Sequence, residues 1–239
     1  MPLGAAESAR ADWLERFPAG FEEREVDDAL ELAAYVEDVP EELRDAAVED
    51  VPGDWLDRWR AFHHGVAVGP LWIGPPWEHS APRLLPVVID PGRAFGTGAH
   101  ATTRLCLAWL SDLEPGSLVD IGCGSGVVAI AAARLGFAPV FAVDDDPAAV
   151  EANERNARAN DVGIDVARVD ALHEPLPSAA VAIANIALDV VVALAARVTS
   201  RTLVTSGYYD NDLPTLDGYD HVDRRTAAGW AADRWQRRE

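Results

Sequence analysis

The chain has 239 residues, 49% of them hydrophobic, and a formal charge of −20 at pH 7. This apolar fraction supports a sizeable packed core and excludes global disorder. Every one of the 20 basic residues is arginine, and no basic stripe stands out, so we expect no direct binding of nucleic acid. The negative charge is consistent with a basic protein partner. It is equally consistent with a surface charge that only keeps the protein soluble.

Cysteine usage and the N-terminal sequence bear on the compartment. Cys106 and Cys123 lack metal-type spacing, so we expect neither a disulfide framework nor a metal site. The start, MPLGAAESAR, lacks the order of a signal peptide. No apolar run approaches the roughly 20 residues that a membrane span needs. These features predict a soluble, cytoplasmic protein without membrane association.

Residues 1–62 are expected to form a small α+β domain. Residues 1–60 carry 18 acidic residues and 6 arginines, a formal charge of −12. Apolar residues at helical spacing predict helices in SARADWLERF and GDWLDRWRAF, and FEEREV and ALELAAYV predict a hairpin around Asp27-Asp28. A Pro/Gly-rich linker is expected over 63–85, followed by a strand in LLPVVID.

Residues 86–239 alternate apolar runs with helical stretches. We expect strands in SLVDI, PVFAVD, DVARVD, AAVAIANI and RTLVTS, with helices over 101–111, 126–135, 147–159 and 187–198. This alternation predicts an α/β domain with a doubly wound, mostly parallel, Rossmann-like sheet. The end of the chain, HVDRRTAAGWAADRWQRR, has no helical stripe and is expected to form a terminal pair of strands.

Three alternate glycines, Gly122, Gly124 and Gly126, fall where strand SLVDI turns into helix GVVAIAAARL. Glycine permits unusual backbone angles, and the missing side chain lets a ligand approach the main chain. In open α/β sheets, ligands bind at the carboxyl ends of strands. The turn therefore indicates a ligand site, although such turns also occur without ligands.

Two cofactors suit this turn. Gly124 begins a G-x-G-x-x-A frame, and Asp144 lies 20 residues further on, so an NAD-linked oxidoreductase stays open. S-adenosylmethionine has no pyrophosphate, and its ammonium suits the carboxylate of Asp120 at the end of the first strand. Because a carboxylate there repels phosphate, Asp120 favours S-adenosylmethionine.

Polar residues end the later strands. Asp144 is expected to accept both ribose hydroxyls. Asp146, followed by proline, is typical of a helix N-cap. Asp170 is placed to approach the adenine edge or simply to form a turn. Asn185 presents donors and acceptors above the crevice, or it caps the next helix.

The segments IDPGRAFGTGAHATTRLCLAWL, VDIGCGSGVVAIAAARLG, AVDDDP and ANI resemble the ribosomal protein L11 methyltransferases, over roughly residues 70–206. The resemblance implies a class I S-adenosylmethionine-dependent fold, in which residues 1–62 are a small, shortened substrate-recognition domain tethered by the linker. It also implies that Thr103, Gly122, Asp144 and Asn185 touch the cofactor and that Phe95 lies against it. Family members methylate amino groups, at lysine side chains and at the N-terminus of L11. The chain departs from the family in its shortened N-terminal part, and this departure bears on the protein substrate rather than on the cofactor.

A lysine amine must lose its proton before it accepts a methyl group. We identify no general base: His100 is the nearest candidate, and a loop-structuring role suits it better. Asn185 is the candidate that orients the amine. NIAL replaces the Asn-Pro-Pro-aromatic clamp of adenine-N6 and glutamine methyltransferases. The sequence therefore predicts a monomeric protein N-methyltransferase whose partner is L11 or another basic protein, and a binding protein without activity remains an alternative.

Overall fold

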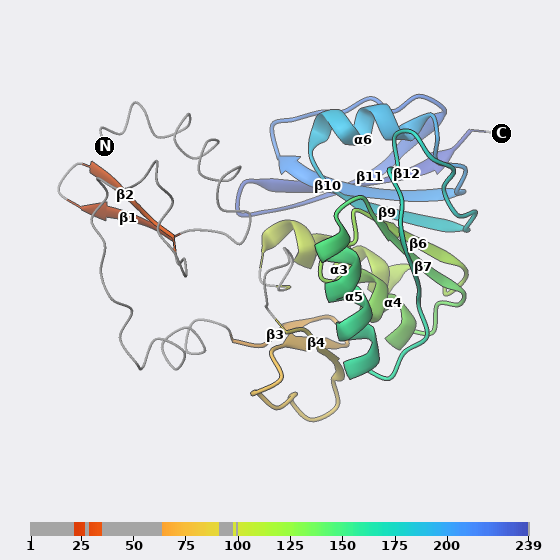
Figure 1. Ribbon diagram of the computed structural model, residues 1–239. Helices are drawn as coiled ribbons and strands as arrows, with labels where there is room; N and C mark the ends of the chain where they lie inside the picture. Colours follow the sequence, from red (N-terminus) through yellow and green to blue (C-terminus); the bar gives the residue numbers. More distant parts are fainter. Residues whose placement is uncertain (1–21, 27–28, 35–63, 91–97, 99, 239) are drawn as a thin grey trace. The chain divides into compact units, whose positions relative to one another are not determined.

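The computed structural model describes residues 22–26, 29–34, 64–90, 98 and 100–238, and the chain divides into two units, 1–60 and 61–239 (Figure 1). In the first unit, β1 (Glu22–Val26) and β2 (Ala29–Ala33) pair antiparallel. The predicted hairpin around Asp27-Asp28 is thereby confirmed. The helices predicted within the first 62 residues lie outside the described residues.

In the described part of the second unit, seven strands form one sheet in the order β11-β12-β10-β9-β6-β7-β8. The strands from β10 to β8 run parallel, and β12 pairs antiparallel with both β10 and β11. The strands are β6 (Leu118–Ile121), β7 (Val140–Asp144), β8 (Asp165–Arg168), β9 (Val181–Asn185), β10 (Thr202–Tyr209), β11 (Tyr219–Ala227) and β12 (Trp230–Arg237). The predicted mostly parallel, doubly wound sheet and the terminal strand pair are both confirmed.

Helices cover both faces of this sheet (Figure 1). One core cluster joins α3, α4 and α5 to one face, and a second cluster joins α6 to the other. The helices are α3 (Ala101–Asp112), α4 (Val127–Arg134), α5 (Pro147–Ala159) and α6 (Leu188–Ala195). Asp146 caps α5 as predicted, because its Oδ1 accepts from the Ala148 N–H at 2.8 Å. The last helix ends at Ala195 rather than at residue 198 as predicted.

The Pro/Gly-rich segment holds more regular structure than a linker. A small sheet, ordered β3-β4-β5, contains β3 (Val66–Val68), β4 (Leu71–Gly74) and β5 (Leu85–Val88). The strand in LLPVVID is confirmed as β5, whereas the two strands before it were not predicted. Proline is compatible with this sheet because Pro86 lies in an edge strand, where no ladder donor is lost.

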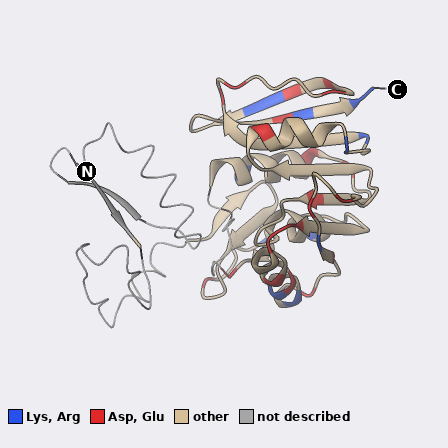
Figure 2. Cartoon of the chain, turned by 45° about the horizontal axis from the view of Figure 1, so that its top comes forward, with Lys and Arg blue, Asp and Glu red and all other residues tan. Residues whose placement is uncertain are grey.

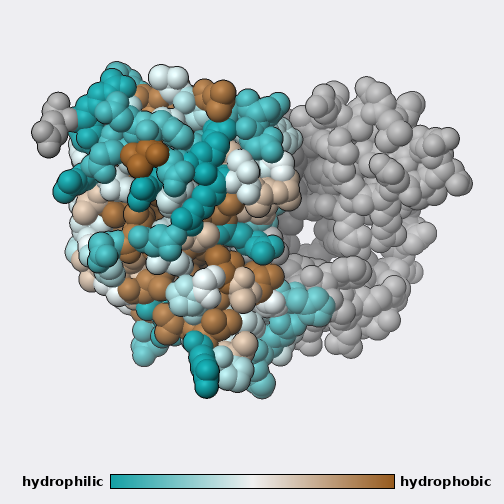
Figure 3. Space-filling model, turned by 180° about the vertical axis from the view of Figure 1, so that it is seen from behind, coloured by the Kyte–Doolittle hydropathy of each residue, from teal (hydrophilic) through white to brown (hydrophobic). Residues whose placement is uncertain are grey.

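The surface of the described residues is mixed. Acidic and arginine residues are interspersed on β11 and β12 (Figure 2), and apolar patches interrupt a largely hydrophilic face (Figure 3). The large exposed apolar side chains are Leu85, Val192, Tyr209, Leu213 and Val222. None of the helices in the described ranges is both long enough and apolar enough to span a membrane.

Candidate functional site

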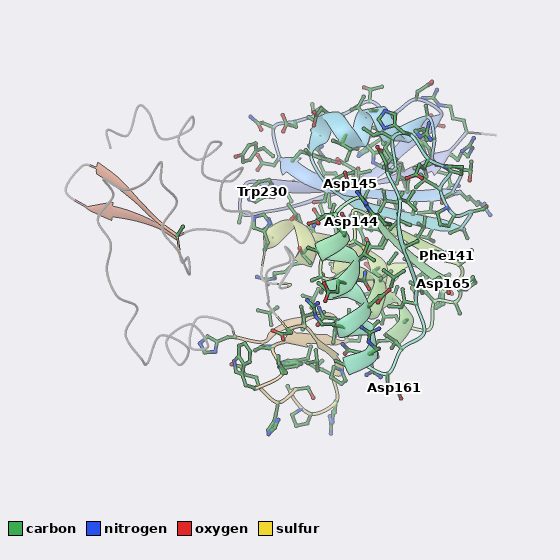
Figure 4. All side chains as sticks on the ribbon, viewed as in Figure 1. Phe141, Asp144, Asp145, Asp161, Asp165 and Trp230 are labelled. Carbon is green, nitrogen blue, oxygen red and sulfur yellow. The ribbon has the colours of Figure 1, made fainter. Side chains whose placement is uncertain are left out.

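The carboxyl ends of β6, β7 and β9 lie side by side along the same side of the large sheet, which we call the ligand edge. The strand order reverses between β6 and β9. Ligands of open α/β sheets bind at such a reversal point. Figure 4 shows Asp144, Asp145 and Trp230 toward this side of the domain, and Phe141, Asp161 and Asp165 toward the other. The candidate site is therefore the edge that carries the glycine turn, Asp144 and Asn185.

The glycine turn is held by its own backbone. The N–H groups of Gly122 and Cys123 donate to the Val143 carbonyl of β7, at 2.9 and 3.1 Å. Gly126 is the N-cap of α4, with φ of +85°, and a Cβ there would lie 2.5 Å from the Asn153 side chain. Close packing under a left-handed backbone thus accounts for Gly126 without any ligand.

Asp144 joins the end of β7 to the glycine turn. Its Oδ2 accepts from the Gly124 N–H at 2.9 Å, and its Oδ1 accepts from the Asp146 N–H at 3.1 Å. Burial raises the pKa of this carboxyl above its usual value, and these two hydrogen bonds oppose the rise. Because a carboxylate has about four acceptor positions, Asp144 retains capacity for ligand hydroxyls. Its contact with a ribose stays a prediction.

Asp120 lies beneath the turn rather than beside an open crevice. It is 3% exposed, and its Oδ2 accepts from the Ala129 N–H, in the first turn of α4, at 3.1 Å. Burial raises the pKa of Asp120 to about 7. In this structure the carboxylate therefore supports the turn from below, and its expected attraction for an ammonium remains a prediction.

Asn185 and Thr103 are brought together as expected for two residues of one site. The Asn185 Nδ2 donates to the Thr103 Oγ1 at 3.4 Å, although the two residues lie 82 positions apart. Thr103 is buried on α3, and Asn185 is partly exposed at the end of β9. Thr103 thereby orients the amide, and the Asn185 carbonyl oxygen remains available as an acceptor.

The remaining candidates are Asp170, His100 and Phe95. Both carboxylate oxygens of Asp170 bond within its own turn, to the Leu172 N–H at 3.0 Å and to the His173 ring at 2.7 Å. The structure thus displays the turn-forming alternative, and the adenine contact stays a prediction. His100 is the N-cap of α3, where its ring nitrogen accepts from the Thr102 N–H. Phe95 lies outside the described residues.

Two asparagines, Asn156 within α5 and Asn160 at its C-cap, hold segments around the site, and sequence reasoning missed them. The Asn156 Nδ2 donates to the Ser125 carbonyl of the glycine turn at 2.9 Å, and its Oδ1 accepts from the Asp90 N–H at 3.2 Å. Asn160 binds both the N–H and the carbonyl of Val88 in β5. The available signal was the spacing of four residues, which places both amides on the buried side of an otherwise polar helix.

A metal centre is not part of this arrangement. Among the residues that the structure describes, no group of three or more His, Cys, Asp or Glu is placed to hold a metal ion.

The strand order, the glycine turn and the polar strand ends together define a Rossmann-like methyltransferase fold. Residues 14–211 match the sequence model of the family described as ribosomal protein L11 methyltransferase (PrmA), and the chain belongs to this family. A crystal structure of ribosomal protein L11 methylase from Lactobacillus delbrueckii subsp. bulgaricus superposes with a TM-score of 0.67 at 26% identity, covering 74% of this chain and 100% of that one.

Curated relatives agree with this assignment. A ribosomal protein L11 methyltransferase from Symbiobacterium thermophilum is 47% identical over 155 residues, which cover 62% of this chain and 50% of the relative. One from Legionella pneumophila strain Lens is 38% identical over 194 residues, which cover 74% of this chain and 65% of the relative. The chain thus spans between half and two thirds of these proteins.

Replacement of Gly126 by alanine should lower the free energy of unfolding by more than the cost of placing alanine in a left-handed backbone conformation. The backbone conformation costs about 1–2 kcal/mol for alanine, and the clash with Asn153 adds to it. Gly136→Ala is the matched control, because Gly136 has φ of +92° but no atom within 4 Å of an added Cβ. Urea unfolding of both variants measures the difference, and equal losses would contradict the proposed packing role of Gly126.

Asp120→Asn should change how stability depends on pH. The pKa of about 7 in the folded protein exceeds the ordinary aspartate value of 3.8, so the folded state binds the extra proton between these values and loses stability as pH rises through them. Asparagine does not titrate, so the variant does not lose stability over this pH range, and its side-chain oxygen can still accept from the Ala129 N–H. The free energy of unfolding of the variant relative to wild type should rise between pH 4 and pH 7, with a slope of up to about 1.4 kcal/mol for each pH unit. If the free energies of unfolding of wild type and variant depended on pH in the same way, burial of Asp120 would not be linked to its protonation.

Proposed function

We propose that the chain transfers methyl groups from S-adenosylmethionine to amino groups of a protein, namely to lysine side chains or the N-terminus of ribosomal protein L11. Membership of the family and the names of the curated relatives support this activity. The substrate is a proposal for this chain because the chain spans only part of those relatives' length.

The hydrogen bond from the Gly124 N–H to Asp144 is the observation that carries the choice of cofactor. A pyrophosphate bound at a glycine turn uses the backbone N–H groups of that turn. Here a carboxylate already accepts from Gly124, and the buried Asp120 lies below the same turn. An anionic pyrophosphate would meet the negative charge of Asp144, whereas the cationic, phosphate-free S-adenosylmethionine is attracted by it. The NAD-linked alternative is disfavoured on this ground.

The residues at the edge fit the parts of S-adenosylmethionine. Asp144 would accept the ribose hydroxyls, the glycine turn would pass beneath the amino-acid end, and Thr103 and Asn185 would lie near the reacting centre. Gly122, Asp170 and Phe95 complete the proposed binding set. When bound, the cofactor supplies a methyl group already activated on a sulfonium. The chain's own task is to orient a neutral amine and exclude water.

Asn185 is proposed to orient that amine. Its Nδ2 is directed to Thr103, which leaves the carbonyl oxygen as an acceptor for an amine N–H and sets the direction of the nitrogen lone pair. His100 is poorly suited as a general base because its ring nitrogen already caps α3, and burial lowers its pKa. Loss of the amine proton to solvent before binding is consistent with this arrangement.

The acidic charge of the chain supports a basic protein as partner. Residues 1–60 contribute −12 of the total of −20, which favours encounter with a positively charged surface. The proposal includes action as a monomer in the cytoplasm, where ribosomal proteins are made.

Methyl transfer is tested by incubating the chain with isotopically labelled S-adenosylmethionine and total ribosomal proteins, followed by mass spectrometry. We expect single-methyl mass increments on lysines or on the N-terminus of L11. Transfer to a different protein would show that the substrate is that protein and not L11. Cofactor binding without any transfer would favour a binding protein, and affinity for NAD without affinity for S-adenosylmethionine would favour an oxidoreductase.

Asp144→Ala should weaken binding of S-adenosylmethionine by about 1.5–3 kcal/mol, the range for hydrogen bonds to charged groups, or roughly 10- to 150-fold. Calorimetric titration measures the affinity. Asp145→Ala is the matched control, because Asp145 is the exposed neighbour and its contact with Arg168 uses only its backbone carbonyl. Equal affinities of the two variants would show that the ribose binds elsewhere.

A further inference from the structure

The exposed ring of Tyr209 lies at the ligand edge, beyond Asn185. Ser206 of β10 is paired with Asn185, and β10 continues past this level to Tyr209, a distance of about 7–10 Å at strand spacing. A register shift between Ser206 and Tyr208 accompanies Gly207, whose φ is +104° and whose added Cβ would overlap the Ile186 backbone. Tyr208 is buried in the α6 cluster, whereas Tyr209 is 58% exposed.

Tyr209, Trp230 and His100 form a row of contacting rings that extends from Tyr209 toward the proposed methyl-transfer site. Its ring stacks on Trp230 with centroids 4.7 Å apart and an interplanar angle of 27°. Trp230 in turn meets the His100 ring edge-on at 4.9 Å. His100 caps α3, and Thr103 in the first turn of this helix bonds Asn185. One face of Tyr209 is therefore supported by Trp230.

The loop after Tyr209 is held by a buried ionic pair. Arg224 donates to both carboxylate oxygens of Asp233, each at 2.8 Å, and Asp233 is fully buried. The same guanidinium donates to the carbonyls of Asp210 and Asp212, at 2.9 and 2.7 Å. In addition, the Tyr209 N–H donates to the Asp212 carboxylate at 3.1 Å. Tyr209 is thus fixed in place without a bound substrate, which reduces the entropy cost of binding.

The chemistry of this surface suits a lysine side chain. A flat ring binds an alkyl stem along its face, and the exposed carboxylate of the next residue, Asp210, attracts a basic substrate. The free α-amine of a protein N-terminus has no comparable stem.

We propose that Tyr209, supported by Trp230, is the substrate-side subsite that selects a lysine side chain over an N-terminal amine for methylation. This proposal rests on the proposed function, since it assigns the substrate class of the same site. Tyr209 acts as a binding and specificity residue, and the amine itself is oriented at Asn185.

Binding is tested by saturation-transfer NMR with Nα-acetyl-lysine methylamide in the presence of S-adenosylhomocysteine. The signal from the side-chain methylene protons of this probe should be equally strong with wild type and Tyr209→Phe, and clearly weaker with Tyr209→Ala and Tyr209→Gln. Leu213→Ala is the matched control, because Leu213 is 81% exposed in the same loop and should leave the signal unchanged. Alanine methylamide, which has a free α-amine and no stem, should give a weak signal with every variant.

Kinetics with L11 provide the second measurement. Tyr209→Ala should raise KM for lysine methylation about two- to fivefold, as expected when about one methylene group of the lysine stem is no longer covered, while kcat and cofactor affinity stay unchanged. An unaltered probe signal in an alanine or glutamine variant that still binds cofactor would overturn the subsite. If wild type binds the probe through Tyr209 but transfers no methyl group to ribosomal proteins, the subsite stands and the proposed function fails.

Discussion

The hydrogen bond between the Asp144 carboxylate and the Gly124 N–H couples two parts of the site that are 20 residues apart. It fixes the glycine turn against the end of β7 before any ligand arrives. The buried Asp120 and the Asn156 amide hold the same turn from other directions. Because its N–H donates to a carboxylate, Gly124 does not offer that donor to an anionic ligand. The glycine turn, the end of β7 and the start of α4 are thereby held in one arrangement.

Local sequence patterns were sufficient for the main sheet and for much of its ligand edge. Apolar runs that end in a polar residue mark buried strands that stop at the surface, which is why Asp144 and Asn185 were correctly placed at strand ends. Asp146 followed by proline specified a helix start for purely local reasons. Thr103 depended on the family resemblance, because periodicity alone does not reveal which buried hydroxyl meets an amide 82 residues away.

Features that arise from long-range pairing escaped prediction. Strands β3 and β4 were not predicted because glycines and prolines surround these short apolar runs in the sequence. The bonds of Asn156 and Asn160 reach segments more than 30 and 70 residues distant, so spacing within α5 did not identify their partners. Arg224 and Asp233 face each other across the hairpin of β11 and β12, and Asp233 is buried on β12, an inner strand of the sheet. The burial of the Asp120 side chain also results from packing, and the pattern of apolar residues in a strand does not predict it.

The antiparallel direction of β12 has a practical consequence for handling this protein. The strand begins at Trp230, on the ligand edge, and runs to Arg237 at the far edge of the sheet. Anything appended after that strand leaves from the side opposite the proposed cofactor site. Immobilisation or fluorescent labelling through the C-terminal end would therefore leave the mouth of the site unobstructed, while the same attachment in the Ala228-Gly229 turn would block it.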